Sequence, residues 1–158
     1  MTPKNIIIGC DNAAVDLKQE IIKVLNEMDI PFEDVGVAES SDQTYYPLVA
    51  EKVCQKIIAS GYQSEGILIC GTGIGMCMTA NKFPGIFAAV CHDNYAAERS
   101  RLSNNGNVLC MGARIVGPEL AKKIAREWLS LSYKPGGSSQ PKVDAMRAID
   151  RREHKMEA

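Results

Sequence analysis

Residues 65–82 read EGILICGTGIGMCMTANK, an apolar run followed by a glycine-rich loop and the start of a helix. Residues 66–69 are unbroken apolar sequence, as expected of a strand buried on both faces of a parallel sheet. Residues 76–82 then begin a helix. A strand, a tight loop and a helix in this order predict one βα unit of an α/β fold.

The loop at residues 71–75 favours an anion. Its three glycines let the backbone turn sharply and leave no Cβ between its N–H groups and a ligand. A helix N-terminus adds free N–H donors and the positive end of the helix dipole. The spacing G-T-G-I-G differs from the G-x-G-x-x-G of dinucleotide-binding proteins, and the Gly-Lys-Ser/Thr of a P-loop is absent. The alternative is that residues 71–75 form only a structural turn, and the number of glycines argues against it.

Cys70 is the main candidate for chemistry, because it ends a predicted strand where ligands bind in open α/β sheets. The same N–H donors and helix dipole favour a thiolate there, and Thr72 can donate a hydrogen bond. A free cysteine is usually a small buried hydrophobe. That interpretation applies to Cys10, Cys54, Cys77, Cys91 and Cys110.

Other polar residues follow predicted strands. Asp11 ends the first strand, so it either faces the crevice of Cys70 or caps the next helix, and both interpretations stay open. Arg114 follows the fifth strand and could hold a phosphate bidentately. His92 follows the fourth strand as an acid–base candidate, although a histidine without a visible partner is more often structural. His154 lies in a polar tail, where we expect it to be solvated.

Composition is that of an ordinary globular domain, with 46% apolar and 23% charged residues among 158 and a net charge of -1. This charge gives no reason to expect nucleic acid or an anionic membrane as a partner. No apolar run approaches the roughly 18 residues of a membrane span, and the N-terminus lacks signal-peptide architecture. Six cysteines without CxxC spacing and two histidines argue against a zinc site. We expect one domain over residues 1–158, reduced and cytoplasmic.

Five strands alternate with helices along the chain, which implies βαβ units and a parallel sheet with right-handed crossovers. The expected strands are residues 5–8, 31–35, 66–69, 85–91 and 108–111. Residues 134–141 form a loop, and residues 142–157 form a charged helix with few apolar anchors. That helix either crosses a neighbouring subunit or is a solvated tail, and the sequence favours neither.

Four stretches in order, GCDNAAVDLK, CGTGIGMCMTANKFPGI, RLSNNGNVLCMGARIVG and the later GG-containing loop, resemble the ribose-5-phosphate isomerase B family. This family also includes galactose-6-phosphate isomerases, and the resemblance covers nearly the whole chain. It implies a three-layer, Rossmann-like fold with a five-stranded parallel sheet. It also implies a homodimer, sometimes a dimer of dimers, with sites between subunits and neither metal nor organic cofactor.

The resemblance also implies a role for each matching residue. Cys70 is the base that moves a proton between C1 and C2 of an open-chain sugar phosphate, Thr72 assists, and the loop amides hold the enediolate. The substrate-contact positions are Asp11, Asn12, Tyr46, Gly71, Gly73, Ile74, Gly75, Ser103 and Asn104. The phosphate-binding positions are Arg114, Ser138 and Lys142.

The chain departs from the family at several of these positions. Asn12 and Ser103 replace two histidines that the family uses for substrate contact and for opening the furanose ring. Phe87 replaces an arginine in the fourth strand. In the C-terminal loop, Ser138 and Lys142 replace arginines, which weakens the expected grip on phosphate.

Two enzymatic explanations remain open. Either a water or His92 opens the ring of a pentose phosphate, or the substrate is a tetrose 4-phosphate, which cannot close a furanose ring. The Leu-Ser-Asn-Asn sequence at residues 102–105 resembles the branch of the family associated with tetrulose phosphates. The alternatives of another class are a non-catalytic phosphosugar-binding module, against which the intact Cys70 and Thr72 argue, and an NAD-linked oxidoreductase, for which we expect no nicotinamide binding.

Overall fold

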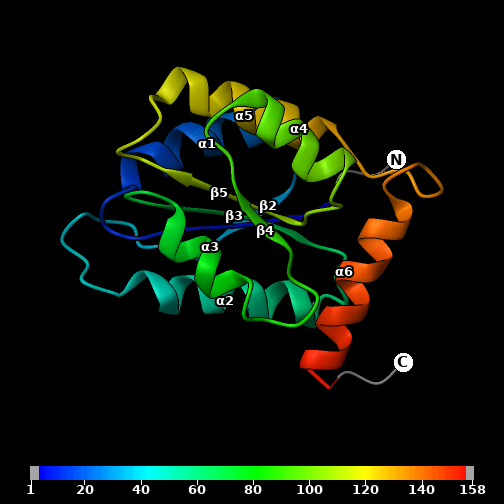
Figure 1. The fold of residues 1–158 in the computed structure, drawn as a ribbon. Helices are drawn as coiled ribbons and strands as arrows, with labels where there is room; N and C mark the ends of the chain where they lie inside the picture. The colour runs from blue at the N-terminus through cyan, green and yellow to red at the C-terminus, as the bar shows by residue number, and fades with distance from the viewer. Residues whose placement is uncertain (1–3, 156–158) are drawn as a thin grey trace.

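Five parallel strands form one sheet at the centre of the computed structural model, which describes residues 4–155 (Figure 1). Their order across the sheet is β2-β1-β3-β5-β4. Their bounds are β1 Ile6–Cys10, β2 Phe32–Asp34, β3 Glu65–Cys70, β4 Ala88–Val90 and β5 Val108–Gly112. The predicted α/β class with five parallel strands is confirmed.

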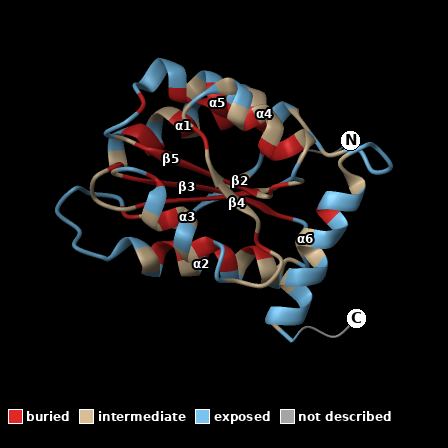
Figure 2. Ribbon diagram, viewed as in Figure 1, coloured by how far each residue is buried: buried red, intermediate tan, exposed pale blue. Residues whose placement is uncertain are grey.

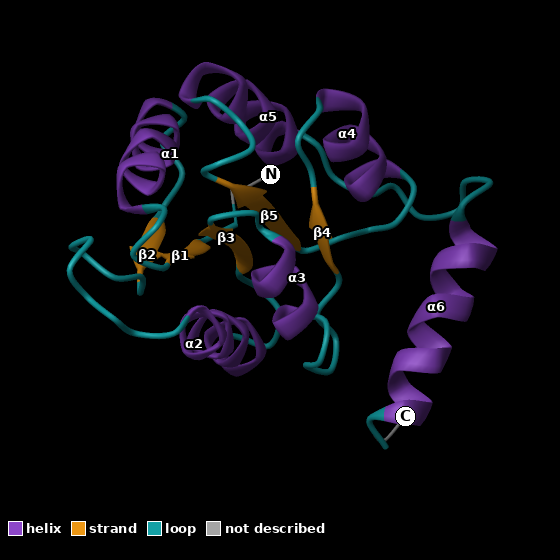
Figure 3. Ribbon diagram, turned by 60° about the vertical axis from the view of Figure 1, so that its left-hand side comes forward, coloured by secondary structure: helices purple, strands orange, loops and turns teal. Residues whose placement is uncertain are grey.

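Helices cover both faces of the sheet, giving three layers (Figure 3). One face carries α1 Val15–Glu27, α4 Asn94–Leu102 and α5 Pro118–Ser130, and the other carries α2 Tyr46–Ala59 and α3 Ile74–Ala80. Because both faces are covered, β1, β3 and β5 are buried along their whole length (Figure 2). Between residues 4 and 155, no helix is long and apolar enough to span a lipid bilayer.

A buried ion pair joins the end of α4 to the amino end of β3. Arg101 and Glu65 form two bonds of 2.9 Å, and the Arg101 guanidinium stacks on Trp128 at 4.1 Å from the ring centroid. Arg101 also donates to the carbonyl oxygen of Gly106 at 2.7 Å. Such a fully partnered arginine is structural, and it fixes the end of α4 against the start of β3.

The last helix, α6 Gln140–Glu153, stands beside the amino ends of the strands and buries only Val143 among its own residues (Figures 1 and 3). Two contacts near its C-terminus hold it to the body. Asp150 accepts a hydrogen bond from the Gly85 N–H at 2.9 Å, and His154 lies 3.1 Å from the Lys82 carbonyl oxygen. The prediction that His154 is only solvated is therefore wrong. The helix starts two residues before its predicted start, and its predicted end at residue 157 lies outside the described residues.

Candidate active site

The site forms at the carboxyl edge of the sheet, at the change of direction between β1 and β3. Cys10 pairs with Ile69 in the parallel register, and the next N–H, that of Asp11, donates to the Ile69 carbonyl oxygen at 3.3 Å. On the other side of β3, Cys70 pairs with Gly112. The ends of three strands therefore converge there, as the topology of an open α/β sheet predicts.

The Cys70 sulfur lies under the glycine loop. Its Sγ accepts a hydrogen bond from the Gly73 N–H at 3.1 Å, which stabilises negative charge on sulfur. Cys70 is 5% exposed, whereas Thr72 in the same loop is exposed. Cys70 therefore belongs to the buried core cluster at the end of β3, directly below the exposed part of the loop.

The loop conformation depends on Gly73, which adopts a left-handed φ of 76° at the N-terminus of α3. A Cβ at this position would lie 2.8 Å from the Met111 carbonyl carbon, so the loop rests directly on β5. Beside it, Thr72 Oγ1 accepts a hydrogen bond from the Ile74 N–H at 3.4 Å. The Thr72 hydroxyl hydrogen remains available to donate.

An aromatic ring and a guanidinium flank the loop. A Cβ at Gly75 would lie 2.5 Å from the Tyr46 ring, and one at Gly71 would lie 3.2 Å from Arg114 Nη1. The main chain fixes the second contact, because the Arg114 N–H donates to the Gly71 carbonyl oxygen at 2.9 Å. Tyr46 and Arg114 therefore both lie against the loop that follows Cys70.

Asp11 serves the local backbone in part. Its Oδ1 accepts a hydrogen bond from the Ala13 N–H at 3.0 Å, in the turn that leads into α1. The N-cap position is Ala14, so the interpretation of Asp11 as the helix N-cap is wrong. Asn12 follows in the same turn, half-buried at the edge of the sheet. The turn leaves the second carboxylate oxygen of Asp11 available to a ligand.

His92 reaches the same edge from the end of β4. Its Nε2 accepts a hydrogen bond from the Gly112 N–H at 2.8 Å, and burial lowers the pKa of the imidazole. Because a backbone N–H can only donate, Nε2 is unprotonated and already engaged. The hypothesis that His92 acts as a base through this nitrogen therefore loses its support.

Four predicted site residues lie at the opposite edge of the sheet. Ser103 and Asn104 follow the C-terminus of α4, which runs antiparallel to the strands. Ser103 Oγ accepts a hydrogen bond from Arg99 at 3.2 Å. Ser138 and Lys142 flank the start of α6, beside the amino ends of the strands (Figure 1). One chain thus does not bring these residues to Cys70.

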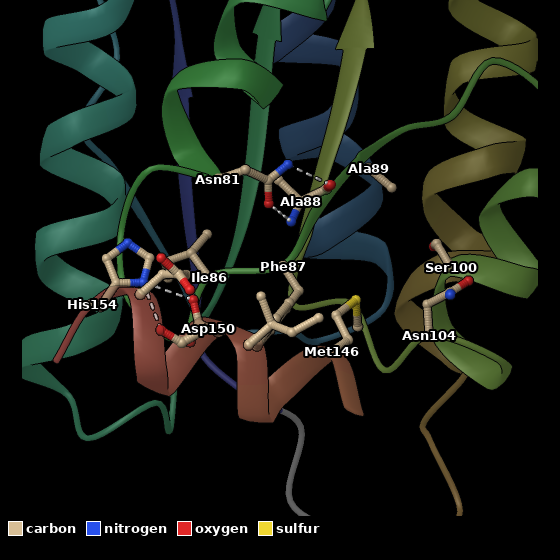
Figure 4. A pocket seen from close by; sticks show the side chains of 13 residues that line it. Asn81, Ile86, Phe87, Ala88, Ala89, Ser100, Asn104, Met146, Asp150 and His154 are labelled. Carbon is tan, nitrogen blue, oxygen red and sulfur yellow. Dashed lines mark hydrogen bonds and ion pairs between the residues drawn. The ribbon is translucent and has the colours of Figure 1, made fainter. Parts of the chain in front are cut away.

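A cavity of about 520 Å³ also lies away from Cys70, between α6 and the edge strand β4 (Figure 4). Phe87 and Met146 line it, and the Asn81 side-chain amide pairs with the backbone of Ala88 at 2.8 and 2.9 Å. Its lining also includes Ser100, Asn104 and the ionisable side chains Asp150, Glu153 and His154, of which Asp150 and His154 pair at 3.0 Å. Cys70 and the glycine loop are not among its lining residues, so this cavity is separate from the carboxyl edge.

The other cysteines divide into two groups. Burial raises the pKa of Cys10 to about 11, that of Cys54 to about 12 and that of Cys91 to about 11. Cys77 differs, because a hydrogen bond with Cys110 lowers its pKa to about 7 and its side chain is half-buried. Its sequence neighbourhood carries no signal of this, since Cys110 lies on another element.

Comparison with known proteins extends these observations. The ribose/galactose isomerase family matches residues 6–146. The chain belongs to this family. It is 48% identical over 147 residues to a ribose-5-P isomerase B of Listeria innocua, covering 93% of this chain and 97% of that protein. It is also 44% identical over 149 residues to a D-erythrulose-4-phosphate isomerase of Pectobacterium atrosepticum, covering 94% and 97%.

A solved family structure has the same fold. It is the ribose-5-phosphate isomerase B of Mycoplasma genitalium with bound ribulose-5-phosphate, which superposes with a TM-score of 0.86 at 33% identity and covers 93% of this chain and 96% of that one. Across residues 4–155, no three His, Cys, Asp or Glu side chains are grouped to hold a metal ion.

Proposed function

We propose that this sugar-phosphate isomerase interconverts an aldose phosphate and a ketose phosphate, with Cys70 moving the proton between C1 and C2. The observation that carries this proposal is the Gly73 N–H bonded to Cys70 Sγ at 3.1 Å, at the edge where three strand ends converge. A carbon acid beside a carbonyl needs a base and hydrogen-bond donors where negative charge develops. The glycine loop supports both requirements.

The proposed reaction uses no outside reagent. The Cys70 thiolate removes the proton from C2 of the open-chain aldose phosphate, and the electron pair moves through the C1–C2 bond to O1. The resulting enediolate faces the amides of residues 71–75, and Thr72 moves the hydroxyl proton between O2 and O1. The Cys70 thiol then returns its proton to C1 and the ketose forms. Arg114, which lies against Gly71, would bind an anionic group of the substrate.

A four-carbon substrate is at least as consistent with these residues as a pentose phosphate. Asn12 and Ser103 offer no group with the acid–base range of histidine, and His92 Nε2 is engaged by Gly112. A tetrose 4-phosphate needs no ring opening, because its phosphate occupies the only hydroxyl that could close a furanose. One of the two relatives is named for a pentose phosphate and the other for a tetrulose phosphate. Their sequence identities to this chain are similar, so sequence identity alone does not decide between the two substrates.

We also propose that the complete site lies between two copies of the chain, as a homodimer or a dimer of dimers. Ser103, Asn104, Ser138 and Lys142 are separated from Cys70 by the length of the sheet, and a second copy could supply them. In that arrangement α6 extends the site of the neighbouring subunit. Six free thiols support a reducing, cytoplasmic setting.

A substrate panel tests this proposal. We expect kcat/KM for erythrose and erythrulose 4-phosphate to exceed that for ribose 5-phosphate. A higher kcat/KM for ribose 5-phosphate would remove the four-carbon hypothesis and leave the isomerase intact. A protein that binds all of these sugar phosphates but catalyses no exchange of substrate hydrogen with solvent would instead be the non-catalytic binding module.

A further inference from the structure

His92 completes the hydrogen bonding of β5 where the neighbouring strand has ended. β4 pairs with β5 only as far as Val90 opposite Cys110, and the Cys91 N–H then donates to the Cys110 carbonyl oxygen at 3.1 Å. The chain leaves the sheet at Asp93, whose carboxylate caps α4 by accepting the Ala96 N–H at 2.7 Å. No strand carbonyl is therefore in place for the Gly112 N–H, and the His92 imidazole accepts this bond at 2.8 Å instead.

Gly112 in turn supports the proposed catalytic loop. It lies opposite Cys70 in the sheet register, and a Cβ on it would lie 2.6 Å from Thr72 Cα, so the two backbones are in direct contact. The next N–H, that of Ala113, donates to the Cys70 carbonyl oxygen at 2.8 Å, and that of Arg114 to Gly71 at 2.9 Å. A shift of Gly112 would therefore move the base, its assisting hydroxyl and the arginine together.

We propose that His92 is a positioning residue of the isomerase, whose neutral imidazole holds Gly112 and through it the loop that carries Cys70 and Thr72. This inference rests on the proposed function of that loop. His92 acts through Gly112 and needs no contact with substrate. Placement errors of about 1 Å at a reacting group can cost about a hundredfold in rate, so such support matters to kcat.

The bond requires the unprotonated imidazole. Protonation would place an N–H on Nε2 facing the Gly112 N–H, so two donors would oppose each other. Burial lowers the pKa of His92, while the carboxylate of Asp93 acts in the opposite direction. The other titratable groups that the chain brings to this edge are Asp11 after β1, Tyr46 at the start of α2, Cys70 at the end of β3 and Arg114 after β5, and Glu127 of α5 accepts a hydrogen bond from Asn94, next to Asp93. Since the folded-state pKa is depressed, the stability that the bond contributes is fully present above the ordinary histidine pKa, and the bond is lost only as pH falls through the lower folded-state pKa.

Nuclear magnetic resonance tests the geometry without any activity. The chain has two histidines, so the substitution His154→Gln leaves His92 as the single imidazole. We expect the neutral ring to carry its proton on Nδ1, to titrate below the ordinary histidine pKa, and to shift the Gly112 amide signal along the same curve. A neutral ring protonated on Nε2 would overturn the inference, and so would a Gly112 amide signal that does not change as His92 titrates.

Kinetics test the consequence. Glutamine can accept the Gly112 N–H through Oε1 without titrating, whereas alanine cannot. We expect His92→Gln to keep kcat within about threefold and to remove the part of the fall in kcat at low pH that is due to His92. We expect His92→Ala to lower kcat by at least about tenfold with little change in KM. Equal kcat values and pH profiles for the two variants would contradict the positioning role.

The two proposals fail in different ways. If Cys70→Ala remains fully active, the proposed base is wrong while the His92–Gly112 bond can still be observed by resonance. If Cys70→Ala is inactive but His92→Gln and His92→Ala behave alike, the function stands and the positioning role is wrong.

Discussion

At the scale of single residues, the surroundings of each sulfur decide its chemistry. Cys70 accepts a main-chain N–H at the edge of the sheet, whereas burial raises the pKa of Cys54 to about 12. Cys77 has a pKa of about 7 because Cys110, which lies on β5, provides a hydrogen bond. A thiol reacts as its thiolate, so the six cysteines differ widely in the reactivity expected of them.

Cys77 should therefore compete with Cys70 for alkylating reagents. At pH 8 we expect iodoacetamide to label Cys77 well before Cys10 or Cys54, because the pKa values of those two are raised to about 11 and about 12. Mass spectrometry of peptides over time measures this order. The variant Cys77→Ser should lose that label and keep isomerase activity. Labelling of Cys54 as fast as Cys77 would contradict the assignment.

At the scale of secondary-structure elements, the glycine loop depends on how closely α3 approaches β5. Gly73 has a φ of 76°, and any Cβ there would meet the backbone of Met111 at 2.8 Å. Backbone atoms cannot rotate away as a side chain can. The loop conformation is therefore fixed by both the torsion angle and the contact, and a larger residue has no way to relieve either.

The variant Gly73→Ala tests this requirement. We expect it to lower the free energy of unfolding by about 1–3 kcal/mol and to reduce kcat, because the residue would be strained in the left-handed region. Gly117→Ala is a matched control, since Gly117 has a φ of -72° and nothing lies within 4 Å of a Cβ there. The lower N-cap preference of alanine and the reduced freedom of the unfolded chain act in opposite directions, so the free energy of unfolding should change by less than about 1 kcal/mol. Urea unfolding of both variants provides the comparison. Equal stability losses would show that the loop tolerates a side chain.

The elements also show how far sequence alone reaches. Apolar runs located β1, β3 and β5, because strands buried on both faces need continuous apolar sequence, whereas the edge strand β2 carries the exposed Glu33 and Asp34. β4 is shorter than its apolar run, since Gly85 has a φ of 72° and the Phe87 N–H bonds to the side chain of Asn107. The contacts of His154 with Lys82 and of His92 with Gly112 join segments distant in the sequence, so no local pattern could predict them.

Some residues of the candidate site could also be predicted from the sequence, and others could not. Strand ends at the carboxyl edge of a parallel sheet must meet, so Asp11, Cys70 and Arg114 could be placed together from the sequence. Ser103 and Lys142 were identified through family resemblance alone. Their position at the amino edge follows from the antiparallel run of α4 and from the place of α6, and both are properties of the whole fold.

At the scale of the whole molecule, a shared site predicts complementation between inactive copies. Cys70→Ala removes the base, and Asn104→Ala removes a side chain at the opposite edge. Mixing the two variants should form hybrid dimers that contain one intact site, so activity should recover to about a quarter of the wild-type level by random pairing of subunits. Subunit exchange between the two variants is verified first. If activity then fails to recover, the result would contradict a site built from two chains.

The proton-transfer step by Cys70 is the central claim, and hydrogen exchange tests it most directly. The substrate is incubated in D₂O with the wild-type enzyme or with Cys70→Ala, and deuterium at C1 and C2 is followed by nuclear magnetic resonance. The wild type should incorporate solvent deuterium, and the variant should do so about 10²- to 10⁴-fold more slowly. Its unfolding curve should stay close to wild type, because this substitution leaves only a small cavity. Exchange by a folded Cys70→Ala at the wild-type rate would contradict the account.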